Sequence, residues 1–515
     1  MSVRTPADGY GGRLVTGTGS NLAATAVVFL CSFLLTPFLL EKLGDARYAL
    51  FVLAQSIVGF SRLLTLGIPA SLSRFLSEAT ARTDERSLIR SFTAGVLLLS
   101  VIGAVTALVI LLLSAVFPRL FPVEEALAGP ARAVLLILGL QVALQMPLLG
   151  FQISYQAVQK FHVPSLTRLV GAVVRTMAIF LVFSLGFVKL VLWALLFAAT
   201  ELLQGIYLAV RSRRMIPALR FRPRSVDRTD LRRLLGFSVW VFLGHLGFLL
   251  YYNTDYLLIH WFVGPEQVAH YNLAARWDPM LRTVVGSFAA LLIPVSASLI
   301  AVRDLPEIRR LLDRATRYCL LVALPSCLLL AIFARPFLRA WAGEAYGEAA
   351  PAMVALLLPL VLTLSQTPSF SLFVGLGKAK VNGILTVAFA VVNVGLSLYF
   401  AVVLRLGLLG IALGTAVTYF VRTGLISPWY VCRITEQPLR PYVTRSILVP
   451  IGTALPMIGI AWFLRDRWAP DTLPEILGTM ALASIAFIVP AWWTVLREAD
   501  RAAIRSGMRR ILRWS

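Results

Sequence analysis

Charged side chains set within long apolar runs are the residues of this sequence best suited to chemistry. They are Arg62, Arg175, Glu201, Asp255, Arg276, Asp278, Arg282 and Arg422. Because a charge at the centre of a membrane helix costs about 2.5–3.5 kcal/mol on insertion scales, such a residue faces a partner or a water-filled cavity. Arginines outnumber acids in this set, and one guanidinium binds two phosphate or carboxylate oxygens at once. The set therefore predicts an anionic ligand.

Four of these residues also have a structural interpretation as ion pairs. Arg175 and Glu201 fall at similar depths in two consecutive apolar runs, and a hairpin of two helices would bring them together. Asp278 and Arg282 are four residues apart, which places them on one face of a helix. A buried pair needs no ligand, so both interpretations stay open from the sequence.

The other charges have looser alternatives. Asp255 and Arg276 fall at depths that permit pairing, and Asn253 adds a second polar group beside Asp255. Arg62 and Arg422 have no acid nearby in the sequence. Each of these two could extend its side chain to the membrane surface, or it could line a cavity and meet an anion.

The elements that must hold these residues are membrane helices. Of the 515 residues, 58% are hydrophobic and 14% are charged, with a mean hydropathy of +0.81. Soluble proteins carry about 25% charged residues. Runs long enough to cross a bilayer, about 20 residues each, fall near residues 20–40, 48–70, 92–117, 132–157, 164–186, 188–210, 235–261, 266–300, 316–338, 349–376, 381–404, 408–432, 443–464 and 473–496. The expected fold class is all-α integral membrane, with about 14 transmembrane helices.

Basic residues in the loops predict the orientation. If the N-terminus is cytoplasmic, the inner segments carry 33 Lys and Arg and the outer segments carry 10, which is the excess expected of cytoplasmic loops. Both termini are therefore expected in the cytoplasm. The net charge of +23 is distributed between the spans, so no nucleic-acid partner is expected.

The longest polar segment suggests how the chain is divided. Residues 1–210 are predicted to form an N-terminal six-helix bundle, and residues 211–234 a basic cytoplasmic linker. Residues 235–432 would form a second six-helix bundle, followed by two extra helices and a basic tail in residues 433–515.

Motifs typical of enzymes are missing from the sequence. It holds no GxSxG, P-loop or HExxH pattern, and its four cysteines form no CxxC pair. No long loop offers an aqueous domain for catalysis. We therefore expect a protein that is not an enzyme and holds no metal or cofactor, with Asp255 or Glu201 as candidate sites for a coupling proton or sodium ion.

Several segments resemble a known family. They are Leu-Thr-Pro-Phe-Leu-Leu-Glu-Lys-Leu-Gly at 35–44, Arg-Tyr-Ala-Leu at 47–50, Leu-Gly-Ile-Pro-Ala-Ser-Leu-Ser-Arg at 66–74, Tyr-Asn-Thr-Asp at 252–255 and Tyr-Asn-Leu-Ala-Ala-Arg at 271–276. Together with the number of spans, they resemble the bacterial polysaccharide exporters, or O-antigen-flippase-like proteins, of the multidrug, oligosaccharidyl-lipid and polysaccharide exporter superfamily.

The resemblance implies two helix bundles, spans 1–6 and 7–12, around a central cavity. It implies a flippase in the bacterial cytoplasmic (inner) membrane that moves an undecaprenyl-diphosphate-linked oligosaccharide by alternating access. It also implies a polysaccharide polymerase and assembly proteins as partners. The positions that could bind the cargo are Arg62, Arg175, Arg276, Arg282, Arg422 and Asn253.

Two alternatives within the superfamily stay open. A lipid II flippase of peptidoglycan synthesis would share the number of spans and a cavity lined by arginine. A cation-coupled multidrug efflux transporter would rely on acids within the spans, and acids are the minority here.

Overall fold

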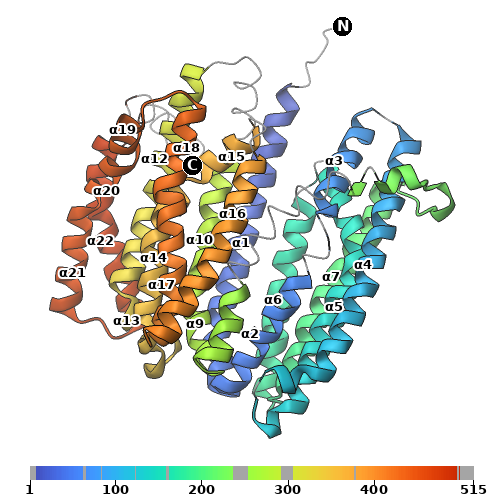
Figure 1. Cartoon of the computed structure of the whole chain (residues 1–515), viewed down its shortest axis with the longest axis horizontal. Helices are drawn as coiled ribbons and strands as arrows, with labels where there is room; N and C mark the ends of the chain where they lie inside the picture. The colour runs from blue at the N-terminus through green and yellow to red at the C-terminus, as the bar shows by residue number, and fades with distance from the viewer. Residues whose placement is uncertain are drawn as a thin grey trace, which may run out of the picture. The chain divides into compact units, whose positions relative to one another are not determined.

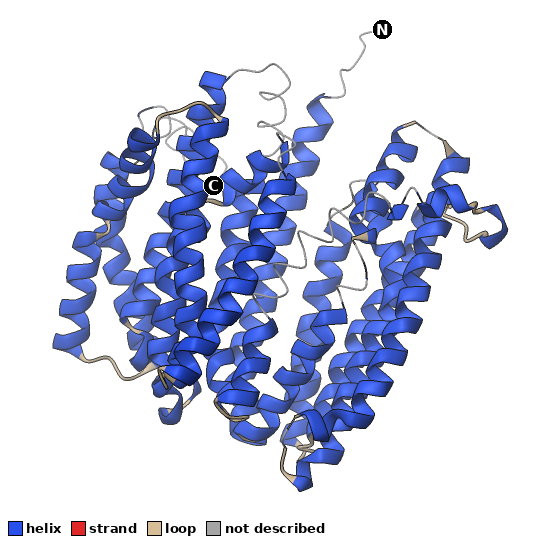
Figure 2. Ribbon diagram, viewed as in Figure 1, coloured by secondary structure: helices blue, strands red, loops and turns tan. Residues whose placement is uncertain are grey.

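The structure is a computed structural model, and all regular secondary structure in the part it describes is helical (Figure 2). It describes residues 7–61, 65, 67–82, 84–121, 123–157, 160, 162–217, 219–232, 234–235, 253–290, 305–375, 379–495, 498 and 501. The all-α fold class predicted from the sequence is confirmed. Arg62, one of the predicted site residues, lies outside the described residues.

Eleven helices in the described residues are long and apolar enough to cross a membrane. They cover residues 23–43, 85–117, 125–155, 162–184, 190–215, 305–332, 344–365, 383–403, 407–434, 439–468 and 473–494. Each corresponds to one of the fourteen predicted spans. The other three predicted spans, near 48–70, 235–261 and 266–300, all include residues that are not described.

The chain divides into two compact units, each with its own packing. The first comprises residues 1–269 and 386–391, and the second comprises residues 270–385 and 392–515. The four-part division expected from the sequence, with a boundary at the basic linker, stays a prediction.

The first unit is built from long helices that run side by side (Figure 1). Its elements are α1 (Ala7–Leu43), α2 (Asp45–Phe60), α3 (Ile68–Ala81), α4 (Glu85–Leu120), α5 (Glu125–Ala157), α6 (His162–Ser184), α7 (Leu190–Met215) and the short 3₁₀ helix η2 (Pro223–Ser225). Helix α5 packs against α4 and α7, and α1 packs against α6. Residues 253–262 add a further helix to this unit.

The predicted span near 48–70 is not one continuous helix. Helix α2 ends at Phe60, and α3 begins at Ile68 after Gly67. Gly67 has φ of 73° and lies in the left-handed region, which glycine adopts without steric cost. Pro69 then occupies the first turn of α3, where the missing N–H leaves no hydrogen bond unmade. These two residues therefore start a new helix inside an apolar run.

The second unit contains shorter and less regular helices. Its elements are α9 (Gln267–Ala275), which begins in the first unit, α10 (Trp277–Ala290), α12 (Leu305–Ile332), α13 (Ala334–Ala342), the 3₁₀ helix η3 (Glu344–Ala349), α14 (Ala350–Ser365), α15 (Thr367–Gly375), α16 (Ala379–Leu398), α17 (Gly407–Tyr419), α18 (Ser427–Ile434), α19 (Leu439–Tyr442), α20 (Val449–Thr453), α21 (Leu455–Trp468) and α22 (Leu473–Thr494), with π-helical segments η4 (Tyr399–Val403), η5 (Phe420–Ile426) and η6 (Val443–Leu448). Helix α14 packs against α12 and α17.

The predicted span near 349–376 is broken at Gln366, between α14 and α15. Gln366 is fully buried, and the Ser365 hydroxyl accepts a hydrogen bond from its Nε2 at 3.1 Å. The Ser369 hydroxyl donates to Gln366 Oε1 at 3.0 Å. In lipid, an interrupted helix persists only where protein groups satisfy the polar atoms that it exposes. Here the Ser365 hydroxyl donates to the Leu362 carbonyl at 2.7 Å and the Thr367 hydroxyl to the Leu364 carbonyl at 2.8 Å.

Candidate functional site

In the first unit, Arg175 of α6 and Glu201 of α7 form an ion pair. The Arg175 Nη1 to Glu201 Oε1 distance is 2.6 Å, and the side chains are 16% and 30% exposed. The guanidinium also lies 4.7 Å from the centre of the Phe197 ring. The ion-pair interpretation made from the sequence is confirmed. Because Glu201 balances its charge, Arg175 is a weaker candidate for an anion ligand than the sequence suggested.

Asn253 and Asp255 also lie in the first unit, on the helix of residues 253–262. The Ser56 hydroxyl of α2 donates to the Asn253 carbonyl at 2.9 Å. A Cβ at Gly59 would lie 2.8 Å from Asn253 Nδ2, so the absence of a side chain there allows the two helices to approach. Asp255 is buried, with 2% of its surface exposed. The structure therefore places Asn253 in a helix contact with α2, and it buries Asp255.

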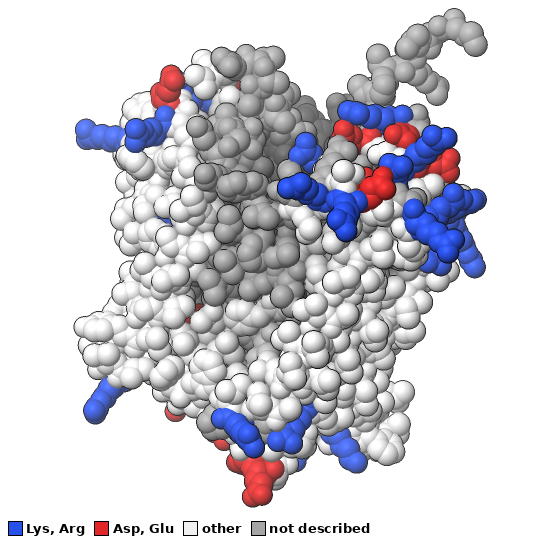
Figure 3. All heavy atoms as spheres, turned by 45° about the vertical axis from the view of Figure 1, so that its right-hand side comes forward, with Lys and Arg blue, Asp and Glu red and all other residues white. Residues whose placement is uncertain are grey.

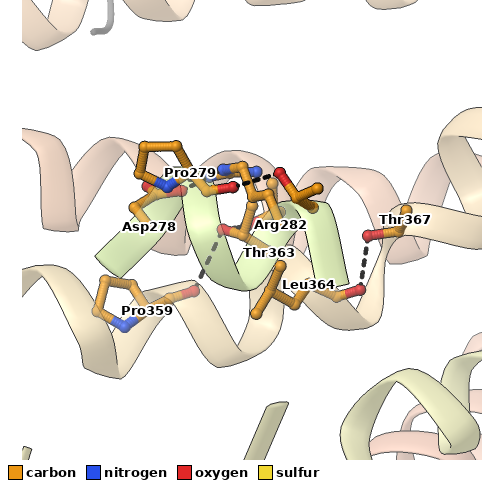
Figure 4. Close-up of polar contacts among 9 residues, drawn as sticks. Asp278, Pro279, Arg282, Pro359, Thr363, Leu364 and Thr367 are labelled. Carbon is orange, nitrogen blue, oxygen red and sulfur yellow. Dashed lines mark hydrogen bonds and ion pairs between the residues drawn. The ribbon is translucent and has the colours of Figure 1, made fainter. Parts of the chain in front are cut away.

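In the second unit, Asp278 and Arg282 form a bidentate pair on α10 (Figure 4). Arg282 Nε donates to Asp278 Oδ1, and Arg282 Nη2 donates to Oδ2 at 3.3 Å. The guanidinium lies 5.2 Å from the centre of the Tyr419 ring at the end of α17. Asp278 is 7% exposed. This pair, which the four-residue spacing predicted, is confirmed.

Hydroxyl groups from α14 and η5 add to this part of the second unit. Thr363 of α14 is buried, and its Oγ1 lies 2.8 Å from Oγ1 of Thr423 in η5. Thr363 also donates to the carbonyl of Pro359 at 3.2 Å (Figure 4). Since α10 packs against α14, polar groups from three elements gather here. Thr363, Thr423 and Tyr419 were not predicted from the sequence. The feature that could have identified them is a hydroxyl group within an otherwise apolar run.

Arg276 and Arg422 occupy irregular points of the helical backbone. Arg276 lies at the break between α9 and α10, and its guanidinium is 5.2 Å from the Trp341 ring centre. Arg422 lies within the π-helical segment η5, 5.6 Å from the Phe370 ring centre. Single π-helical turns and broken membrane helices are frequent at functional sites. These two arginines therefore differ from Arg175, which lies within a continuous helix.

The predicted site residues fall unequally on the two units. The first holds Arg175, Asn253, Glu201 and Asp255, together with Arg62 by its sequence position. The second holds Arg276, Arg282 and Arg422 beside Asp278. The first set therefore holds two arginines and two acids, whereas the second holds three arginines and one acid. Among the described residues, no group of three or more His, Cys, Asp or Glu could hold a metal ion.

These features define a multi-pass integral membrane protein with partly exposed arginines among its apolar helices. A family model described as "Polysaccharide biosynthesis protein" matches residues 14–300, which is more than half of the chain. The chain therefore belongs to the polysaccharide biosynthesis protein family, as the sequence motifs predicted.

Two curated relatives agree with this assignment. The uncharacterized membrane protein EpsK of Bacillus subtilis (strain 168) is 25% identical over 497 residues, which cover 95% of this chain and 97% of EpsK. The putative O-antigen transporter of Shigella flexneri is 21% identical over 427 residues, which cover 81% of this chain and 98% of that protein.

Solved structures share the fold. The lipid II flippase MurJ in an inward closed conformation superposes with a TM-score of 0.69 at 14% identity, covering 93% of this chain and 98% of MurJ. An inward-facing multidrug resistance MATE transporter of the MOP superfamily superposes with a TM-score of 0.68 at 15% identity, covering 81% and 99%. The chain therefore has the fold that these MOP-superfamily proteins share.

Proposed function

We propose that this protein moves an undecaprenyl-diphosphate-linked oligosaccharide across the bacterial cytoplasmic membrane by alternating access. The observation that carries this proposal is the excess of arginine in the second unit. There, Arg276, Arg282 and Arg422 are accompanied by Asp278. Membership of the polysaccharide biosynthesis family supports a saccharide as the rest of the cargo.

A diphosphate suits these arginines on chemical grounds. A guanidinium presents a planar fork of N–H donors that matches two phosphate oxygens. Arg276 and Arg422 each lie within 6 Å of an aromatic ring centre, a geometry in which the ring face attracts the cation. A desolvated diphosphate needs several such donors.

The irregular backbone supports a role in the transport cycle. The break at Arg276 and the π-helical segment around Arg422 loosen the regular hydrogen bonding of their helices. Discontinuous membrane helices often form the binding site of transporters, near the bilayer midplane. We infer that Arg276 and Arg422 contact the diphosphate, while the Asp278–Arg282 pair fixes the surrounding helix α10.

The first unit has a different proposed role. Its Arg175–Glu201 pair joins α6 to α7, and Asp255 is the candidate site for a coupling proton or sodium ion. We further propose that both termini are cytoplasmic, as the loop charges predict, and that a polymerase and assembly proteins receive the cargo. The relation to MurJ concerns the fold alone, so lipid II is the alternative cargo to be tested.

The experiment is a flipping assay in proteoliposomes. The cargo is a fluorescent undecaprenyl-diphosphate oligosaccharide, and transport is read as the fraction that becomes accessible to a membrane-impermeant quencher. Loss of one charged hydrogen bond costs about 1.5–3 kcal/mol, so Arg276→Gln and Arg422→Gln should each slow flipping about 10- to 150-fold. The matched control is Arg175→Gln/Glu201→Gln, which removes a complete pair and should retain flipping.

Parallel arms with other cargoes test the alternatives. Vesicles loaded with lipid II or with a cationic dye, with and without a proton or sodium gradient, distinguish a lipid II flippase and a multidrug exporter from the proposed function. Faster transport of either alternative cargo than of the oligosaccharide would overturn the proposal. Normal oligosaccharide flipping by both arginine variants would overturn the assigned site.

A further inference from the structure

The basic segment that follows α7 is packed against the first unit. Leu219 and Leu234 are 3% and 2% exposed, and both belong to the same apolar cluster as Leu72 of α3 and Phe92 of α4. Four partly buried apolar side chains of the same segment pack against that cluster, and they are Ile216, Val226, Leu231 and Leu235. The segment from residue 211, in the last turns of α7, to residue 235 is here called the linker. Where the structure describes it, the linker is packed against the first unit along its length.

Polar contacts fix the linker to the beginning of α4. Thr93 is fully buried, and its hydroxyl donates to the carbonyl of Arg220 at 3.4 Å. The backbone N–H of Arg222 donates back to the Thr93 hydroxyl at 3.2 Å. Arg90 of α4 pairs with Asp227 of the linker at 3.6 Å. The two backbone contacts do not depend on the side chains of Arg220 and Arg222.

The side chains of the linker arginines point outward. The exposed ones are Arg211, Arg213, Arg214, Arg220, Arg222, Arg224, Arg228 and Arg232. Figure 3 shows Lys and Arg side chains gathered at this end of the first unit, with carboxylates among them, beside a surface of uncharged side chains. Leu219 and Leu234 are buried while Phe221 and these arginines are exposed, and the exposed arginines are here called the basic face.

The basic face adjoins the surface that contacts lipid. Helix α7 exposes Ile206, Tyr207 and Val210 at 47–49% immediately before Arg211. The Arg211 Nη1 donates to the Tyr207 hydroxyl at 2.5 Å. Tyrosine is enriched where membrane helices pass the lipid head groups. This contact therefore places the start of the basic face at head-group depth, beside the acyl chains.

A polar pocket of about 410 Å³ opens between the linker and α4. Its lining includes Arg86, Ser87, Arg90 and Ser91 of α4, with Asp84 and Asp230 as its acids. Asp84 already accepts a hydrogen bond from the backbone of Ser87, and Asp230 accepts one from the backbone of Asp227. The pocket thus combines the guanidinium groups of Arg86 and Arg90, the second already paired with Asp227, with two hydroxyl groups and two carboxylates. Guanidinium and hydroxyl groups are donors that bind phosphate oxygens.

We propose that the basic face and this pocket bind the phosphate head groups of anionic phospholipids in the adjacent leaflet. The acyl chains would lie along the exposed apolar side chains of α7, and the phosphates would lie against the arginines. A basic residue near an anionic membrane surface contributes about 1 kcal/mol, which is about fivefold in affinity. Because the linker follows the last helix of the predicted first bundle, the bound lipids would act where the two predicted bundles are joined.

The test is lipid binding by the purified full-length protein. Native mass spectrometry in detergent counts bound phosphatidylglycerol against phosphatidylcholine as each is titrated. Wild-type protein should retain phosphatidylglycerol preferentially. The variant Arg220→Gln/Arg224→Gln/Arg228→Gln leaves the anchoring backbone groups in place and should weaken phosphatidylglycerol binding at least tenfold. Replacing the same three residues with lysine keeps the charge and should restore most of the binding.

A matched control removes three exposed arginines elsewhere. Arg433→Gln/Arg440→Gln/Arg445→Gln removes the same charge from α18, α19 and η6 of the second unit, at exposed positions predicted on the same side of the membrane. This variant should bind phosphatidylglycerol within twofold of wild type. An equal loss in both triple variants would show a general charge effect and overturn the proposal.

Two further outcomes are decisive. Inorganic phosphate at millimolar concentration should not displace the lipid, and displacement would identify a soluble phosphate ligand and overturn the lipid assignment. The single variant Arg86→Gln, with one charge removed from the pocket, should weaken phosphatidylglycerol binding by about fivefold. Unchanged binding in both Arg86→Gln and the linker triple would also overturn the proposal, whereas gel filtration confirms that each variant is folded.

Discussion

The two units use arginine in different ways, although the sequence presents all their arginines alike. In the first unit, Arg175 lies within a regular helix and bonds to Glu201 across a hairpin. In the second, Arg276 and Arg422 lie at a helix break and in a π-helical segment, each against an aromatic ring. Arg282 of the second unit, which pairs with Asp278 within α10, resembles Arg175 instead. We infer from this comparison that an arginine at an irregular point of the backbone is the better candidate for a ligand.

The largest expected effect comes from the pair in the second unit. Asp278→Asn leaves the Arg282 guanidinium, whose side chain is 24% exposed, without the bidentate carboxylate of the buried Asp278. Breaking a buried pair by removing one partner costs about 3–5 kcal/mol. We expect that loss in the unfolding free energy measured by steric trapping in bicelles. The double variant Asp278→Asn/Arg282→Gln should recover more than half of it, and no recovery would contradict the pairing.

Close helix contacts provide the next largest effect. A Cβ at Gly414 of α17 would lie 2.6 Å from the backbone nitrogen of Ser397 in α16. A backbone atom cannot relieve such a clash by changing rotamer, as a side chain can. Gly414→Ala should therefore cost about 1–3 kcal/mol through overpacking. In the first unit, a Cβ at Gly171 would meet only the Gln204 side chain, which can change rotamer. Gly171→Ala should cost less, and thermal unfolding that ranks the two variants in reverse would contradict these packings.

The ion pair of the first unit is expected to matter less than that of the second. Its carboxylate is 30% exposed and makes one hydrogen bond to Arg175, whereas the Asp278 side chain is 9% exposed and makes two hydrogen bonds to Arg282. We expect Glu201→Gln to cost about 1–3 kcal/mol. The double variant Arg175→Gln/Glu201→Gln should be close to wild type, and both should flip cargo. A thermal unfolding midpoint lower for Glu201→Gln than for Asp278→Asn would reverse the ranking of the two units.

The smallest effect concerns the beginning of α4. Asp84 caps this helix by accepting a hydrogen bond from the Ser87 backbone N–H at 3.0 Å. Asp84→Ala should cost about 1 kcal/mol. Asp84→Asn retains a hydrogen-bond acceptor and should lower the unfolding free energy by only about a few tenths of a kcal/mol. A thermal unfolding series of the two variants checks the cap, and equal losses would assign the effect to charge.

Much of the fold could be predicted because apolar runs of membrane-crossing length leave few alternatives. The Asp278–Arg282 pair followed from its four-residue spacing, and the Arg175–Glu201 pair from equal depth in a hairpin. Both predictions needed only helix geometry. The family assignment needed only short motifs near the first and seventh spans, and the match over residues 14–300 confirmed it.

The irregular points could not be predicted from the runs. The runs near 266–300 and 349–376 stay apolar enough on average to predict continuous spans, so their polar residues and prolines around Arg276 and Gln366 did not mark the breaks. Each break depends on partners distant in the sequence or on local hydroxyl groups, such as Ser369 for Gln366. The docking of the linker was missed for a similar reason, since the few apolar residues spaced among its arginines become informative only when α3 and α4 are placed.

The most direct test of the central claim is diphosphate binding at equilibrium. Isothermal calorimetry would compare a short-chain polyprenyl diphosphate oligosaccharide binding to wild type, to Arg276→Gln/Arg422→Gln and to Arg175→Gln/Glu201→Gln. We predict that the first variant loses at least 100-fold in affinity and that the second stays within threefold of wild type. Equal affinities of all three proteins, or a loss confined to the Arg175→Gln/Glu201→Gln variant, would contradict the claim that the arginines of the second unit bind the cargo.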